Sequence, residues 1–485
     1  MAESAPSDHL WILAKNSTAM LVANVIVAIL MFGFIRSAAQ KLGPDGFGTY
    51  TLAVTISTML VSTIDFGSSL LVIRQVAKNR TTAGAYLVNG GILRGVSTAV
   101  MVPLLVLVVH IVDKPSSVKV AIWVSGLSAT FLSWTEFFLA FFNAFEKMEF
   151  TAFIKLLDSV LLAAGGILYL SRFSDPIGLL WVYVIVRCSL MLLSLMFVFK
   201  ILPVRSNVMP SRSFSMTLLN QALPFGILVA FRLIYFQVDT VLLSAWSGTR
   251  GETNVGIYQA ALKLIVFLMV VPDMLSRAMF PVLSQYASHS HQQVQKLLGK
   301  ALSYFCIFSL PFLVGVLILG DKIVLFLYQG EYSPSVVVLR ILSLMIPVRF
   351  CSYALGITLS AIDKQKARTF SAGLSAVINI VLNLVFIPLF GFVGVSIVRI
   401  VTEIVLFGGY YFFVSKSLSK ISFKAMLLKP AFAAILMGIG LLLLKNANIL
   451  MLIAFSVPLY FVLLLLVKGL PKEDLYLIRR AILQR

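Results

Sequence analysis

The chain has 485 residues, of which 60% are apolar and 12% charged, and its mean hydropathy is +0.99. Soluble domains carry about 25% charged residues, so this composition excludes a water-soluble protein of this length. Mostly apolar runs of about 20 residues recur throughout, the length that a helix needs to cross ~30 Å of hydrocarbon. The composition therefore predicts an all-α integral membrane protein.

Fourteen membrane spans are predicted from these runs. The first begins after a short polar start and is too long for the core of a signal peptide, so we interpret it as a span. In chain order the predicted spans cover residues 11–36, 47–73, 86–112, 119–142, 150–170, 177–199, 219–246, 255–280, 298–319, 335–360, 369–388, 391–414, 425–444 and 449–467.

A formal net charge of +20 invites a nucleic-acid partner, but the basic residues are spread over short loops. One alternate set of loops, with the C-terminal tail, holds 21 lysines and arginines, and the other set holds 7. Positive loops stay in the cytoplasm. The pattern therefore predicts no nucleic-acid partner, an even number of spans, and cytoplasmic N and C termini.

Two short stretches, "KLGPDGFGTY" (41–50) and "GETNVGIYQA" (251–260), share a Gly-x-Tyr after a polar turn. We expect each to be an external turn, with glycine allowing tight backbone and tyrosine at interfacial depth. A later aspartate keeps the same spacing. The residues that recur 208 positions apart are Gly48 and Gly256, Tyr50 and Tyr258, and Asp65 and Asp273.

This repeat predicts two six-helix lobes. Six is an even number, so both copies keep one orientation and are related by a pseudo-twofold axis along the membrane normal. The predicted domains are an N-terminal lobe (1–212), a C-terminal lobe (213–420), and a C-terminal segment (421–485) with two additional spans and a tail.

Several charged residues lie deep within predicted spans, where a charge costs ~2.5–3.5 kcal/mol on insertion scales. Arg232 lies about 18 Å into its span, Asp239 follows on the same face, and Lys263 lies about 10 Å from the external end of the next span. Arg349 is deep in another. We predict that Arg232, Lys263, Arg349 and Asp239 bind substrate; the alternative is that Arg232 and Lys263 only pair with Asp239 or extend to an interface.

Further charged residues are predicted to act in coupling or gating. Asp273 and Arg277 are four residues apart, as are Arg399 and Glu403, which places each pair on one helical face. A structural ion pair is the favoured interpretation for Arg399 and Glu403. Asp65, Asp273 and Arg277 lie near the predicted cytoplasmic ends, where gating contacts between the lobes and structural ion pairs are equal alternatives.

Chemical motifs are few. His289 and His291 lie in a polar loop without further ligands, and Cys188, Cys306 and Cys351 are isolated in apolar runs, so we expect neither a metal site nor disulfides. The sequence has no Gly-rich nucleotide loop and no hydrophilic domain for a transferase site. We therefore expect a protein that is not an enzyme, needs no cofactor, and draws on an ion or lipid gradient or a partner.

The segments "KLGPDGFGTYTLAVTISTMLVSTIDFGSSLLVIRQVAK" and "SAVINIVLNLVFIPLFGFVGVSIVRIVTEIVLFGGYYFF" resemble spans of Wzx-type polysaccharide flippases. In the second segment Asn379 and Asn383 precede a proline and a Gly-x-x-Gly turn. The resemblance covers roughly residues 10–420. These flippases belong to the multidrug/oligosaccharidyl-lipid/polysaccharide exporter superfamily. The superfamily also contains drug and toxin antiporters and lipid II flippases.

The resemblance implies a central cavity that opens alternately to each side of a bacterial or archaeal cytoplasmic membrane. It also implies a cargo, an oligosaccharide repeat unit on polyprenyl pyrophosphate destined for surface polysaccharide. Membrane lipids, a coupling proton or sodium ion, a polysaccharide polymerase and a chain-length regulator are the implied partners. A cation-coupled drug exporter, a lipid II flippase and an integral-membrane glycosyltransferase or polymerase remain the alternatives.

The loop charges make the topology testable. Tags at Arg485 and in the loop around Lys366 should report from the cytoplasm, and a tag near Arg250 should report from outside. Accessibility of each tag in intact cells is the measurement. If Arg485 and Arg250 report from the same side, the predicted number of spans is wrong.

Overall fold

Helices run through the described residues, and no strand is found among them. The computed structural model describes the backbone of residues 6–65, 67–111, 114–202, 209–419 and 421–469, and their side chains except those of 6–25, 61–63, 108, 111, 224–225, 227–236 and 425. The chain forms two compact units, Met1–Gln259 and Ala260–Arg485. The all-α membrane fold predicted from the sequence is confirmed.

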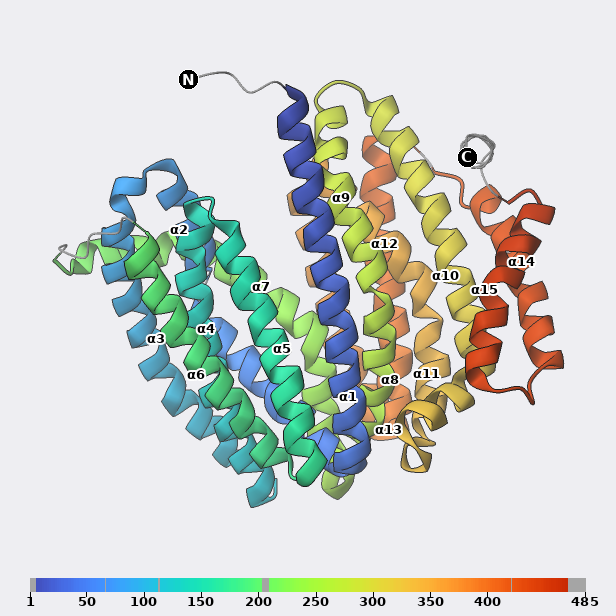
Figure 1. Ribbon diagram of the computed structural model, residues 1–485, viewed down its shortest axis with the longest axis horizontal. Coiled ribbons are helices and arrows are strands. Elements are labelled where there is room, and N and C mark those ends of the chain that lie inside the picture. The colour runs from blue at the N-terminus through green and yellow to red at the C-terminus, as the bar shows by residue number, and fades with distance from the viewer. Residues whose placement is uncertain (1–5, 66, 112–113, 203–208, 420, 470–485) are drawn as a thin grey trace. The chain divides into compact units, whose positions relative to one another are not determined.

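The first unit holds helices that alternate with short turns (Figure 1). Its elements are α1 (Pro6–Asp65), α2 (Ser68–Lys78), η1 (Arg80–Thr82), α3 (Ala83–Ile111), α4 (Ser116–Ala144), α5 (Met148–Arg172), α6 (Pro176–Ile201), α7 (Arg212–Trp246), η2 (Gly248–Arg250) and the first part of α8 (Gly251–Leu268).

The second unit continues from α8 in the same manner. Its further elements are α9 (Val270–Ala287), α10 (His291–Tyr328), η3 (Gly330–Tyr332), α11 (Ser335–Ser343), α12 (Met345–Ala361), α13 (Gln365–Ser417), α14 (Lys424–Leu443) and α15 (Ile449–Leu466). The last two pack on α10 through a buried apolar cluster that includes Ile307, Met437 and Tyr460.

Two of the helices contain a sharp bend and hold two predicted spans each. In α1 the bend is at Gly43, with φ 64° and ψ 177°, and in α13 it is at Gly391, with φ 55° and ψ −131°. Positive φ favours glycine, because a Cβ atom would strain the backbone there. The glycines therefore allow the chain to reverse direction between spans without a long loop.

The described residues contain ten helices that are long and apolar enough to cross a membrane, or eleven if α11 and α12, bent by 44°, form one span. Because α1 and α13 each hold two predicted spans, this number is compatible with fourteen spans, which stays a prediction. The predicted lobe boundary at residue 212 is also untested. The helix that follows it, α7, packs on α1, α2 and α3.

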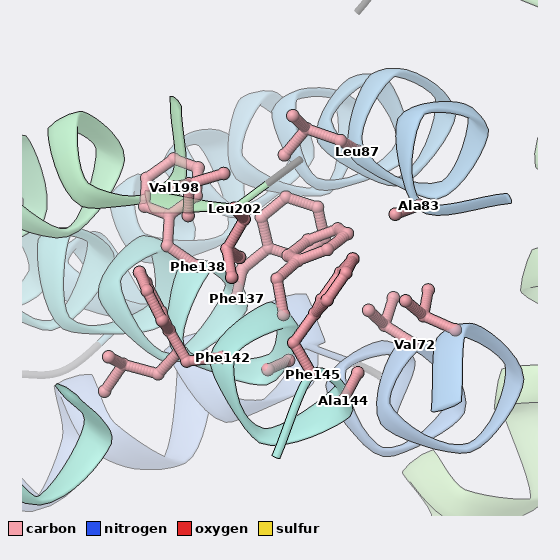
Figure 2. Packing of buried hydrophobic residues seen from close by; sticks show 14 of the residues in the cluster. Val72, Ala83, Leu87, Phe137, Phe138, Phe142, Ala144, Phe145, Val198 and Leu202 are labelled. Atoms are coloured by element: carbon pink, nitrogen blue, oxygen red, sulfur yellow. The ribbon is translucent and has the colours of Figure 1, made fainter. Parts of the chain in front are cut away.

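Phenylalanines of α4 form the centre of an apolar core in the first unit (Figure 2). Phe137 and Phe141 share one face of α4 because they are four residues apart. Phe138 and Phe142 lie beside them, and Phe145 follows the last residue of the helix. Their rings pack against residues of the neighbouring helices, namely Val72 and Val76 of α2, Leu87 of α3, Ile154 of α5, and Leu190 and Val198 of α6. The cluster therefore holds four helices around α4.

The two glycines of the Gly-x-Tyr repeat lie within helices and meet each other. A Cβ atom at Gly48 would overlap the backbone oxygen of Glu252, and one at Gly256 would overlap that of Pro44. Close approach, and not the predicted tight turn, is thus the reason for glycine here. The turn itself is made by Gly43. The tyrosines differ from expectation too, because Tyr50 and Tyr258 are buried in the protein.

Alanine at Gly48 should lower stability. The added methyl group would force α1 and α8 apart, and overpacking of this kind costs about 1–3 kcal/mol. The melting temperature of the detergent-solubilised protein is the measurement. Gly91→Ala is the control, because nothing lies within 4 Å of a Cβ atom there; equal melting temperatures for the two variants would contradict the close contact.

Candidate functional site

A line of polar contacts joins α7 to the start of α8. Asp239 is buried and accepts a hydrogen bond from the Tyr258 hydroxyl at 3.2 Å. One residue further along both helices, Gln259 Nε2 donates to Thr240 Oγ1 at 2.5 Å. The tyrosine of the second Gly-x-Tyr therefore fixes Asp239, one of the residues predicted to bind substrate.

The other tyrosine of the repeat also makes a buried polar contact. Tyr50 and Tyr183 share a hydrogen bond of 2.7 Å between their hydroxyls, and the guanidinium of Arg187 lies 5.0 Å from the Tyr183 ring centroid. Arg187 also donates to Ser128 Oγ at 3.1 Å. Since the aromatic face is electron-rich, this arrangement partly satisfies a cation inside a membrane helix.

Asp65 ends α1 and forms an ion pair with Arg94 of α3. Arg94 is 1% exposed; it also donates to the backbone oxygen of Ser133 at 2.8 Å and lies 4.9 Å from the Phe137 ring centroid. Asp65 in turn accepts from the backbone and hydroxyl of Ser69, in the first turn of α2. The pair thus ties the junction of α1 and α2 to α3 and α4.

Arg349 and Glu403 form the central ion pair of the second unit. Arg349 Nη1 lies 2.8 Å from Glu403 Oε2, and their side chains are 9% and 0% exposed. The Arg349 guanidinium also lies 5.2 Å from the Tyr353 ring centroid. Arg349 was predicted to bind substrate and Glu403 to act in gating, and the structure brings these two predicted residues together from α12 and α13.

Lys263 of α8 is half-buried and makes no hydrogen bond or ion pair with any side chain that the structure describes. An ammonium group within a membrane helix is costly unless water or an anion reaches it. Lys263 therefore has the chemistry expected of a contact for an anionic substrate. Its predicted role stays untested.

The remaining predicted residues are found in different settings. Asp273 and Arg277 form the expected pair four residues apart at 2.9 Å, with side chains 36% and 77% exposed. Arg399 is buried in α13, and its predicted pairing with Glu403 stays a prediction. Arg232 belongs to α7, but its side chain lies outside the described residues.

A further buried ion pair lies at the α7–α8 corner. Lys114, between α3 and α4, pairs with Glu252 of α8 at 2.9 Å, and the side chains are 6% and 7% exposed. Lys114 also donates to the backbone oxygen of Ser244 at 2.8 Å, near the end of α7. Sequence spacing carried no signal for this pair, because its partners are far apart in the chain.

The sequence was compared with those of known families. The profile of a family described as "Polysaccharide biosynthesis protein" matches residues 13–287, and a second profile, MatE, matches residues 224–385. The first match covers more than half of the chain. Two relatives come from the archaeon Haloferax volcanii.

The first of these relatives is a probable low-salt glycan biosynthesis flippase, Agl15. It is 20% identical over 391 residues, which is 79% of this chain and 80% of the relative. The second is a probable flippase, AglR. It is 30% identical over 202 residues, which is 41% of each chain.

Two solved structures have a similar fold. An inward closed conformation of the lipid II flippase MurJ aligns with a TM-score of 0.75 at 16% identity, covering 95% of this chain and all of that one. An inward-facing multidrug resistance MATE family transporter of the MOP superfamily aligns with a TM-score of 0.65 at 14% identity, over 82% and 98% of the chains. These likenesses establish the fold.

Removal of one member of the buried pair should destabilise the protein. Arg349→Ala or Glu403→Ala removes one side of a buried ion pair, a change that costs about 3–5 kcal/mol. Replacement of both residues, as Arg349→Met with Glu403→Leu, should recover most of the loss. The free energy of unfolding is the measurement, and Arg277→Ala, which removes an exposed pair, should change it by less than about 1 kcal/mol. Equal effects of the buried and exposed changes would contradict this account.

Proposed function

Because the chain belongs to the polysaccharide biosynthesis protein family, we propose that it is a multi-pass membrane flippase that moves a lipid-linked oligosaccharide across the cytoplasmic membrane. The family match over residues 13–287 is the observation that carries the proposal. A relative named as a glycan biosynthesis flippase, aligned over 79% of the chain, supports it.

The proposed cargo is an oligosaccharide unit on polyprenyl pyrophosphate for surface polysaccharide synthesis, and the proposed direction is outward. Alternating access would expose one binding region to each side in turn. Both termini would then lie in the cytoplasm, as the loop charges favour. Transport would be driven by a coupled cation, a lipid gradient or withdrawal of the product by a polymerase, and would involve no bond-making step on the flippase.

We propose Lys263 and Arg232 as separate contacts for the anionic part of the cargo. Lys263 is supported by its half-buried position without a partner among the described side chains. Arg232 is supported by its place near the middle of α7 and by the bidentate fit of guanidinium to phosphate oxygens. Asp239, held by Tyr258, belongs to the same proposal as the acidic neighbour of Arg232 on α7.

Arg349 enters the proposal with Glu403 as its partner. A phosphate would have to compete with this carboxylate for the guanidinium, so we propose that the pair opens or is shared when cargo binds. For gating we propose Asp65, Asp273, Arg277 and Arg399 together with Glu403. Of these, the exposed Asp273–Arg277 pair is the one that can exchange partners at least cost.

A second candidate is a cation-coupled exporter of drugs or toxins. It is favoured by the MatE profile over residues 224–385. Expression of the chain in a strain without its own oligosaccharide flippase distinguishes the two. Restored surface polysaccharide supports the first proposal, whereas drug resistance without restored polysaccharide supports the second.

The two cations give a sharper test. Lys263→Ala and Arg232→Ala should each reduce transport of lipid-linked oligosaccharide into everted membrane vesicles tenfold or more, with the protein present at normal abundance. Lys263→Arg and Arg232→Lys should recover part of the activity, because the charge remains while its geometry changes. Lys296→Ala, in the polar start of α10, is the control.

Two results would count against these roles. Full transport by either alanine variant would remove that residue from the binding site. A loss of protein in Arg232→Ala that is matched by Asp239→Ala would indicate a structural pair instead.

A further inference from the structure

The starts of two helical segments cross at the Gly48–Gly256 contact. Segment 44–48 begins the second half of α1, and segment 252–256 lies in the first turns of α8. Backbone touches backbone here, because a Cβ atom at either glycine would overlap a carbonyl oxygen of the other segment. We call these two segments the crossing.

The crossing is symmetric. Gly48 faces the backbone of Glu252, and Gly256 faces that of Pro44, which are the same two positions exchanged after a shift of 208 residues. Asp45 Oδ1 also meets Thr253 Oγ1 at 3.3 Å, and these residues are themselves 208 apart. A contact between a residue and its own repeat counterpart lies on a twofold axis. The pseudo-twofold axis that relates the two segments therefore passes through the crossing.

One ion pair breaks this symmetry. Glu252 pairs with Lys114, but the repeat counterpart of Glu252 is Pro44, which has no charge. The counterpart of Lys114 is Lys322, which donates to the backbone oxygen of Ala447 at 2.8 Å, beyond the end of α14. Among the described residues, Lys114–Glu252 is the ion pair that reaches the crossing, and it is almost completely buried.

We propose that the crossing is the external gate of the transport cycle and that the Lys114–Glu252 ion pair is its latch. The inference rests on the proposed function, which requires the external ends of these helices to separate. Lys114 acts as a positioning residue, since it holds the α7–α8 corner through the Ser244 oxygen as well as through Glu252.

The chemistry of the contact suits a gate that must reopen. Burial of an ion pair costs hydration that its Coulombic attraction only partly returns, so its net stabilisation is small. When the gate opens, water restores the hydration of both charges. A glycine crossing also has no interdigitated side chains to separate. The closed state is therefore well defined in geometry and only weakly favoured in free energy.

Replacement of the latch by apolar residues should hold the gate closed. Lys114→Met with Glu252→Leu removes the gain in hydration on opening, so we expect transport to fall tenfold or more while the melting temperature is kept or raised. The reversed pair, Lys114→Glu with Glu252→Lys, should recover part of the transport. Asp321→Asn, which removes the partly exposed Arg340–Asp321 pair, is the control.

A cargo-independent measurement separates this proposal from the proposed function. Spin labels at the exposed positions 41 and 250, introduced as Lys41→Cys and Arg250→Cys after replacement of the native cysteines, report the distance across the crossing. The double apolar variant should show only the short distance, and Glu252→Gln should add a longer one. If the double apolar variant, Glu252→Gln and the protein with the native ion pair all give the same distance distribution, the proposed latch is wrong, whichever cargo is transported.

A disulfide across the twofold axis completes the test. Asp45→Cys with Thr253→Cys should cross-link on oxidation, because the native side chains already meet, and transport should stop until a reductant is added. The extent of cross-linking is read from protection against maleimide-polyethylene glycol. Unchanged transport by the cross-linked protein would overturn the gate. Absence of transport by the unmodified protein would overturn only the proposed function.

Discussion

A charged side chain inside hydrocarbon must find an opposite charge, an aromatic face or water, and this requirement determines how the helices are joined. Arg94 is satisfied by Asp65, a carbonyl oxygen and Phe137 at once. Arg349 is satisfied by Glu403 and Tyr353. Each of these cations joins residues of different helices, so the polar contacts help to determine which helices are neighbours while the apolar clusters fill the space around them.

The residues that recur 208 positions apart make different contacts in the two units. Asp65 and Asp273 recur 208 positions apart, yet the first makes a partly buried pair between helices and the second an exposed pair within one turn. Lys114 and Lys322 are also 208 positions apart; Lys114 pairs with the Glu252 carboxylate, whereas Lys322 donates to the backbone oxygen of Ala447. Residues that recur in the sequence thus make different electrostatic contacts in the two units.

Hydropathy and spacing predicted the all-α membrane class, the helical ranges and the Asp273–Arg277 pair, because each depends on residues near one another in the chain. Contacts between different helices could not be predicted, because their partners are far apart in the sequence. The ion pair between Arg349 and Glu403, which are 54 positions apart, is an example that spacing did not predict. Gly48 was expected to form a turn, but the turn is formed by Gly43. Gly48 instead allows close approach of the Glu252 backbone, a contact that the sequence alone does not predict.

A helix contact made by backbone atoms restricts the amino-acid sequence at only a few positions. At the crossing, two positions must lack a side chain, while the carbonyl groups that face them belong to every residue type. Chains can therefore diverge almost everywhere else and still assemble in the same way. Identity of 16% to a solved structure that aligns with 95% of this chain is compatible with such tolerance. Because so few side chains are required, the sequence motif of the crossing is short, and a search by amino-acid sequence alone finds little more than Gly-x-Tyr.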